Sequence, residues 1–279
     1  MKYLLIATMF LSALVQGQPV LTFDKRFVES EDRWVAFQKG KDSTYMYGFI
    51  YIDAQAGLTL NYEGTFTISG TGTFIPHKQD SANFKVRLQP NQVRVAFIPE
   101  EKFRELQVSP VPEWLKYYKT DTASIERLYR WGYMYNGWNE CVKALSYLEK
   151  AQTINPAHKG LTVELAFSYN CLQQYGKAIS VLQDALKADP ADAYSNKELI
   201  YAQIKSGRLN DAAESCKKAI ARCPDKSYNG ENCYNLLHSY YEKKDKANFY
   251  LWLPETKKWT ASNAELTRSV KIMEDELAK

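Results

Sequence analysis

The stretch that decides the fold is residues 141–156, CVKALSYLEKAQTINP, because its pattern returns twice at a constant interval. Residues 175–190 read YGKAISVLQDALKADP, and residues 209–224 read LNDAAESCKKAIARCP. Each of the three segments has alanine at its fourth and eleventh positions and proline at its sixteenth. A repeat of this spacing is typical of stacked helix-turn-helix units, which present a binding surface and seldom perform chemistry.

A second helical pattern precedes each of these segments in the same register. In the first unit, Trp131, Gly132 and Tyr135 supply a large, a small and an aromatic residue. Small residues let two helices approach closely, and proline ends a helix because it has no amide hydrogen and clashes with the preceding turn. In the third unit Ile200 and Gln203 replace the small residue and the tyrosine, so its helix spacing is expected to differ.

This pattern resembles that of the tetratricopeptide repeat (TPR) family over residues 125–258. The resemblance implies an α-helical solenoid over residues 124–260, built from units of about 34 residues. The units are expected at 125–158, 159–192 and 193–226, with a degenerate fourth at roughly 227–259. The sequence Ser262-Asn263-Ala264-Glu265 has a capping-box pattern, and apolar residues at helical spacing follow it. It predicts a capping helix within residues 261–279.

Residues 1–17 have the pattern of a secretory signal peptide. Lys2 precedes an apolar run from Tyr3 to Val15, and Gly17 supplies a small residue for cleavage. The run is shorter than the ~20 residues that a membrane span needs. We therefore expect an exported protein that is periplasmic, bound at the cell surface or secreted, with no transmembrane segment.

Residues 27–108 read as strands and predict a β domain over residues 18–110, so the chain is expected to be a two-domain α+β protein. Apolar and polar residues alternate over 58–68, and residues 44–52 are apolar on both faces. Two further runs, 84–88 and 93–97, flank Pro90-Asn91 and predict a hairpin. These short strands favour an antiparallel β-sandwich-like domain or an open barrel, which resembles no family that we recognise. Residues 111–123 are expected to form the linker.

The five cysteines offer alternative pairings. Residues equidistant from a tight helical turn lie at the same height, which predicts two facing pairs, Cys141 with Cys171 and Cys216 with Cys233. Cys223 competes for Cys233. A disulfide between Cys216 and Cys233 is the pairing that we predict, and the alternative is that these cysteines are small buried core residues.

Nothing in the sequence points to chemistry at a metal or cofactor. The three histidines lie in separate regions, and none has a second ligand at metal-binding spacing. The net charge is only +4, with both signs interspersed, so a nucleic-acid footprint is not predicted either. We expect no catalytic residue, no metal and no cofactor.

The TPR resemblance implies that the first helix of each repeat lines a concave groove. The groove positions are Tyr129, Tyr133, Asn136, Val163, Phe167, Asn170, Lys197, Tyr201 and Ile204. Tyr133, Phe167 and Tyr201 would form an aromatic column that buries apolar side chains of an extended peptide, while the asparagine amides bond its backbone. The alternative is that the groove packs on the linker or on the strand domain.

Together these features predict an exported, non-enzymatic scaffold that binds a peptide segment of a protein partner in an envelope complex. Two other function classes remain open. The β domain could itself bind a glycan or a surface, and the repeats would then only support it. An enzyme whose site is assembled from distant residues is a weaker alternative.

Overall fold

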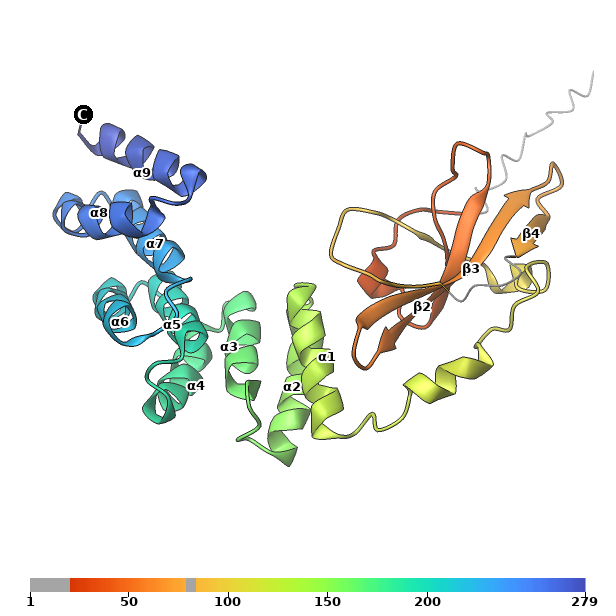
Figure 1. The fold of residues 1–279 in the computed structure, drawn as a ribbon, viewed down its shortest axis with the longest axis horizontal. Coiled ribbons are helices and arrows are strands. Elements are labelled where there is room, and N and C mark those ends of the chain that lie inside the picture. Colours follow the sequence, from red (N-terminus) through yellow and green to blue (C-terminus); the bar gives the residue numbers. More distant parts are fainter. Residues whose placement is uncertain (1–20, 79–83, 279) are drawn as a thin grey trace, which may run out of the picture. The chain divides into compact units, whose positions relative to one another are not determined.

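The structure is a computed structural model that describes residues 21–78 and 84–278 (Figure 1). The predicted signal peptide lies outside these ranges. The chain divides into two compact units between Lys119 and Thr120.

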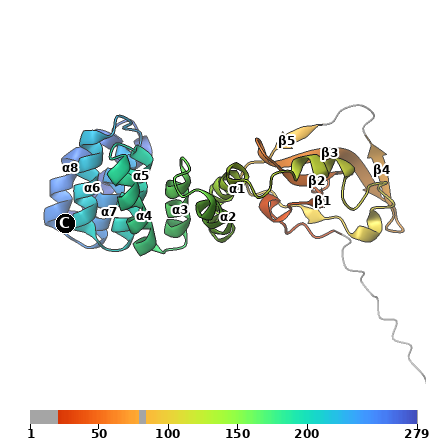
Figure 2. The ribbon, with the colours of Figure 1, turned by 90° about the horizontal axis from the view of Figure 1, so that it is seen from below.

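The first unit is built on one antiparallel sheet of six strands (Figure 2). The strands are β1 (Arg33–Ala36), β2 (Tyr45–Asp53), β3 (Gly57–Ile68), β4 (Phe74–Lys78), β5 (Lys85–Arg87) and β6 (Ala96–Phe97). Their order is β4-β3-β2-β1-β6, and β5 also pairs with β3. The predicted central strand over residues 44–52 corresponds to β2. β2 lies between β1 and β3, as its apolar residues on both faces indicated.

Within the described residues the strands make a single sheet rather than the two packed layers that a sandwich requires. The long strand β3 pairs with two short strands along the edge that faces away from β2. Its first half pairs with β5 and its second half with β4. β3 therefore brings β4 and β5 into the same sheet. No second sheet covers the aromatic core within the described residues.

The predicted hairpin between residues 84–88 and 93–97 is wrong. β5 pairs with β3, whereas β6 pairs with β1. Alternating apolar residues suit pairing with any strand, so local alternation did not distinguish a near partner from a distant one.

The core of this unit is completed by a segment that the sequence assigned to the linker. The 3₁₀ helix η3 (Glu113–Tyr118) places the Trp114 ring 5.8 Å from that of Phe49 and 5.0 Å from that of Tyr51. Tyr118 also contacts Tyr51, with ring centroids 4.6 Å apart. Edge-to-face contacts of this kind stabilise aromatic clusters beyond the burial of their area.

The second unit is an array of paired helices. Its helices are α1 (Ile125–Gly137), α2 (Cys141–Ile154), α3 (Leu161–Cys171), α4 (Tyr175–Ala188), α5 (Ala193–Lys205), α6 (Leu209–Arg222), α7 (Asn229–Glu242), α8 (Lys246–Thr260) and α9 (Ala264–Leu277). The starts of α2, α4 and α6 coincide with the starts of the three repeated segments. Each pair closes tightly because small residues stand where its helices cross. A Cβ on Gly132 would come within 2.4 Å of the Leu148 side chain, and Ala144, Ala178 and Ala212 are fully buried.

The array ends in α9, which packs on α7 and α8 through Val270, Met273 and Leu277. Its N-cap is Asn263, whose side chain accepts hydrogen bonds from the backbone N–H groups of Glu265 and Leu266. The helix therefore begins one residue later than the Ser262 capping box predicts, because the asparagine side chain takes the role of the cap.

Candidate functional site

All nine groove positions lie on the first helices of their repeats. Tyr129, Tyr133 and Asn136 stand on α1, Val163, Phe167 and Asn170 on α3, and Lys197, Tyr201 and Ile204 on α5. Successive first helices, α1, α3, α5 and α7, contact one another directly, whereas contacts among α2, α4 and α6 are sparse. The first helices therefore form the inner row of the array. We call their shared surface the inner face.

The three aromatic residues of the predicted column differ in exposure. Tyr133 is 58% exposed, while Phe167 and Tyr201 are half-buried. The Tyr129 ring lies 6.4 Å from that of Tyr133. Val163 and Ile204 are buried and belong to the packing between helices. The exposed Tyr133 ring next to Tyr129 offers apolar surface to a ligand.

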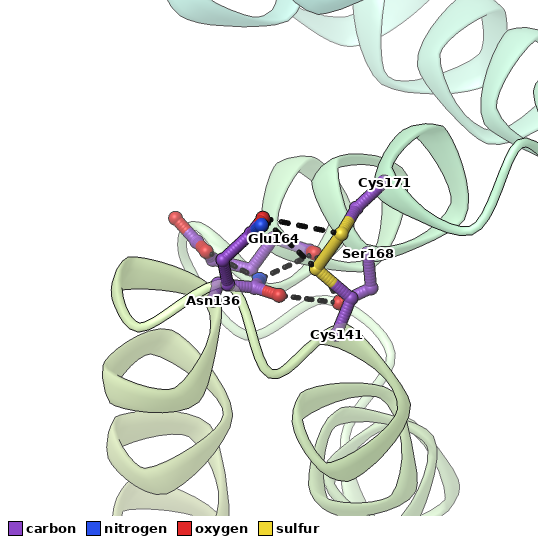
Figure 3. Close-up of a disulfide and its surroundings, with 6 residues drawn as sticks. Asn136, Cys141, Glu164, Ser168 and Cys171 are labelled. Carbon is purple, nitrogen blue, oxygen red and sulfur yellow. Dashed lines mark hydrogen bonds between the residues drawn. A yellow bond between two sulfur atoms is a disulfide. The ribbon is translucent and has the colours of Figure 1, made fainter. Parts of the chain in front are cut away.

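The two asparagines have a different role from the predicted one. Asn136 Nδ2 donates to the backbone oxygen of Glu164 at 2.9 Å and to its Oε2 at 2.8 Å (Figure 3). Asn170 repeats this contact with Glu198, at 3.1 and 2.8 Å. All four side chains are buried. The amides therefore fasten each first helix to the next, and their donors are not offered to the backbone of a peptide.

Glu164 and Glu198 are inner-face residues that the sequence reasoning missed. Each is only 4% exposed. Burial raises the pKa of Glu164, the hydrogen bond from Asn136 partly opposes this, and the nearby charge of Glu198 raises it further. The signal was available in the sequence. Both acids occupy equivalent positions of successive repeats, and each follows an asparagine at the same separation of 28 in the sequence.

Lys197 compensates the second of these carboxylates. Its Nζ lies 3.3 Å from Oε1 of Glu198 and 3.7 Å from Oε1 of Glu231. The same ammonium lies 5.6 Å from the ring centroid of Tyr194 and 5.7 Å from that of Tyr228. The charge of Lys197 is thus held between carboxylates and aromatic rings, the surroundings that favour a partly desolvated cation.

A disulfide between Cys141 and Cys171 joins the start of α2 to the end of α3 (Figure 3). It links two consecutive repeats next to the Asn136–Glu164 contact. One of the two facing pairs that the sequence suggested is therefore bonded. Such a cross-link restricts the unfolded chain and holds the repeat boundary in place.

The other pair is close but not bonded. Cys216 and Cys233 have their Sγ atoms 3.8 Å apart at the α6–α7 boundary, and both are free thiols. Cys223 is directed elsewhere, since Asn196 Nδ2 lies 3.5 Å from its Sγ. The Cys216–Cys233 disulfide stays a prediction, and the structure holds its two sulfurs in contact.

The described ranges hold neither a metal-binding cluster nor a membrane-spanning helix. No three His, Cys, Asp or Glu side chains gather there in an arrangement that could hold a metal ion. No helix in those ranges is both long and apolar enough to cross a membrane.

Comparison with known proteins gives only a fold-level likeness. No family model matches the chain, and no curated protein does. Among solved structures, MamA from Desulfovibrio magneticus RS-1 is 22% identical, with 59% of this chain and 87% of that chain covered and a TM-score of 0.45. YrrB, described as a TPR protein with an unusual peptide-binding site, is 18% identical, with 54% and 76% covered and a TM-score of 0.46. Likeness this low carries no inference about partners.

Proposed function

We propose that this protein is an exported, non-enzymatic scaffold whose inner face binds an extended peptide segment of a partner in an envelope complex. The observation that supports the proposal is the placement of three aromatic residues, Tyr133, Phe167 and Tyr201, at equivalent positions of α1, α3 and α5. These residues come from three successive inner helices, and the first is largely exposed. Aromatic anchors supply much of the binding energy where proteins recognise peptides.

Contacts between neighbouring helices are expected to keep the inner face rigid. Buried Asn–Glu contacts and the Cys141–Cys171 disulfide hold α1, α3 and α5 to their neighbours. A preorganised surface loses little conformational entropy when a ligand binds. The column therefore keeps its spacing without a ligand.

A second candidate function is surface or glycan binding by the strand domain. Two aromatic side chains of that unit favour it, because Phe84 is 51% exposed and Tyr117 is 71% exposed. Exposed rings stack on sugar faces as well as on peptides. This alternative predicts that the partner contacts the first unit and not the array.

The experiment places a photoreactive benzoylphenylalanine at position 133, 84 or 250 of the full chain. Tyr250 on the outer helix α8 is the matched control, since it is an aromatic residue with 43% of its surface exposed. Irradiation in the native envelope should give one dominant protein adduct at position 133, and sequencing of the adduct should locate the label in a single short segment.

Two results would contradict the proposal. Equal adducts at positions 133 and 250 would mean that the inner face is not selective. A dominant adduct at position 84 alone would favour the strand domain. Mass spectrometry of the exported protein tests the predicted cleavage of the signal peptide. We expect a chain that begins at Gln18, and an exported chain that retains Met1 would contradict the prediction.

A further inference from the structure

The third repeat lacks an aromatic ring that fills a gap in the second. Tyr169 on α3 is buried, and its hydroxyl donates to Oε1 of Glu149 on α2 at 3.5 Å. Lys177 Nζ on α4 lies 5.4 Å from the centroid of the same ring. The ring therefore stands between the outer helices α2 and α4, which make few direct contacts. The equivalent residue on α5 is Gln203, which has no ring.

A pocket of about 380 Å³ lies at the equivalent place, between α4, α5 and α6. Three of its lining residues are the repeat equivalents of Tyr169 and of its two neighbours. They are Gln203 for the tyrosine, Gln183 for its hydrogen-bond partner and Asp211 for the lysine. The pocket is therefore the space that the tyrosine ring fills one repeat earlier. Its volume falls within the range of pockets that hold small ligands.

The same exchanges leave acceptors without donors at this end of the pocket. Gln203 is only 4% exposed, and its Oε1 has no donor among the residues that the structure describes. Asp211 brings a carboxylate to the position where the second repeat has an ammonium, and within the described ranges it forms no ion pair. A buried acceptor beside an uncompensated carboxylate favours a cationic guest that carries several N–H donors.

The basic side chains of the pocket do not compensate Asp211. Lys218 pairs with Glu214 at 3.1 Å, and Lys187 pairs with Asp184 at 2.7 Å. Arg222 is the last residue of α6, whereas Asp211 lies in its first turn. At about 1.5 Å per residue the two are about 16 Å apart along the helix axis. The end of the pocket at Gln203 and Asp211 is thus the acidic end.

We propose that this pocket binds a guanidinium group, carried by free arginine or by an arginine side chain of another protein. The flat guanidinium would take the place of the missing ring. Its N–H groups would donate to the Asp211 carboxylate and to the Gln203 amide, which can turn about its last bond to aim its oxygen at the guest. The stem of the guest would lie along Leu186 and Leu199, which also line the pocket.

Shape and charge together select this group. A guanidinium is planar like a ring, is always charged and presents donors around its edge, whereas an ammonium is a compact point charge. The pocket lies between the outer helices, away from the inner face. The inference therefore goes beyond the proposed function, and either can fail without the other.

The test is calorimetric titration of the full chain, with its disulfide intact, with L-arginine and with L-citrulline. Citrulline has the same length and a planar end group but no charge. Arginine should bind saturably, and citrulline should bind roughly tenfold more weakly, the loss expected for a hydrogen-bonded charged group. In protein labelled with ¹⁵N-glutamine, arginine should also shift the side-chain amide signal of Gln203. That signal is identified by its absence from Gln203→Met.

Two variants test the residues of the acidic end. Asp211→Asn keeps the shape of the side chain, removes its charge and should weaken arginine binding roughly tenfold. Asp121→Asn, at an exposed acid outside the pocket, is the matched control and should leave the affinity unchanged. Gln203→Tyr restores the ring of the second repeat and should abolish binding. Circular dichroism checks that each variant is folded. Asp211 is exposed, so the first variant tests the proposal even if Gln203→Tyr does not fold.

A further titration separates the two sources of the guanidinium group. Acetyl-arginine amide should bind as well as free arginine if the pocket takes a side chain of another protein. A clear preference for free arginine would instead identify the amino acid as the ligand, and either pattern supports guanidinium binding. Three results would overturn it. They are no saturable binding of arginine, which would leave only water in the pocket, equal binding of citrulline, and binding of the phenol p-cresol in place of arginine.

Discussion

Asn136 Nδ2 lies 2.8 Å from Oε2 of Glu164, and this buried contact joins α1 to α3. The equivalent contact between Asn170 and Glu198 joins α3 to α5. The two are not equally satisfied. Asn136 Oδ1 accepts a hydrogen bond from Ser168 Oγ at 2.7 Å, whereas the buried Asn170 Oδ1 has no donor among the described residues.

The first prediction uses that difference. The position equivalent to Ser168 one repeat later is Ala202, which is fully buried. Ala202→Ser should give Asn170 Oδ1 its missing donor and stabilise the protein by about 1 kcal/mol. Ser168→Ala should destabilise it by about 1–3 kcal/mol, because a buried acceptor loses its partner. Urea unfolding measures both changes. Ala221→Ser on the exposed side of α6 is the control. If it changes the free energy of unfolding as much as Ala202→Ser does, the gain at position 202 does not come from a hydrogen bond to Asn170.

The second prediction concerns pH. The folded-state pKa of Glu164 is raised above its ordinary value of 4.5. As pH rises from that value, the unfolded chain releases the proton before the folded chain does, so the free energy of unfolding falls. The fall continues until the pH passes the folded-state pKa. Glu164→Gln lacks this contribution. The free energy of unfolding of wild type should therefore fall relative to that of the variant as the pH rises through this window.

Chemical unfolding of both proteins, from about pH 4 to about pH 7, measures this difference. Other titrating groups are common to both proteins and largely cancel. Glu198 interacts with Glu164 and is the exception, so the Glu198→Gln background should show a smaller effect. A difference that is constant across the whole range would contradict a raised pKa at Glu164.

The third prediction tests the crossing points of the helices. Ala178 is fully buried in α4. Ala178→Leu must push helices apart and should cost about 1–3 kcal/mol of stability. Ala221→Leu adds the same atoms at an exposed helical position and should change stability by less than about 0.5 kcal/mol. Thermal melts compare the two, and an unchanged midpoint for Ala178→Leu would mean that the repeat register is wrong.

The fourth prediction is a second cross-link between repeats. Cys216 and Cys233, with sulfurs 3.8 Å apart, should form a disulfide when the protein is exposed to an oxidised thiol such as glutathione disulfide. Each bond formed releases two reduced glutathione molecules. Closing this loop adds ~3 kcal/mol in the chain-entropy model. Peptide mapping without reductant should show it alongside Cys141–Cys171, whereas a Cys223–Cys233 link would favour the competing pair.

In the helical unit, sequence and structure agree where short-range spacing decides the outcome. Small residues at Ala144, Ala178 and Ala212 and the prolines after α2, α4 and α6 act within one repeat or between adjacent ones, so a single period predicts the helix pairs. The first helices were located well enough for all nine groove positions to fall on them.

What only the tertiary structure decided involves partners that are distant in sequence or equivalent between repeats. β5 pairs with β3 and β6 with β1, because alternation specifies a face and not a partner. Asn136 and Asn170 bind buried carboxylates rather than a ligand, because helix stacking brings residues of neighbouring repeats into contact. The sequence by itself therefore determined the repeat and its helices. Packing across repeats decided which buried polar groups are satisfied and which, such as Asn170 Oδ1, have no hydrogen-bond partner in the part of the chain that the structure describes.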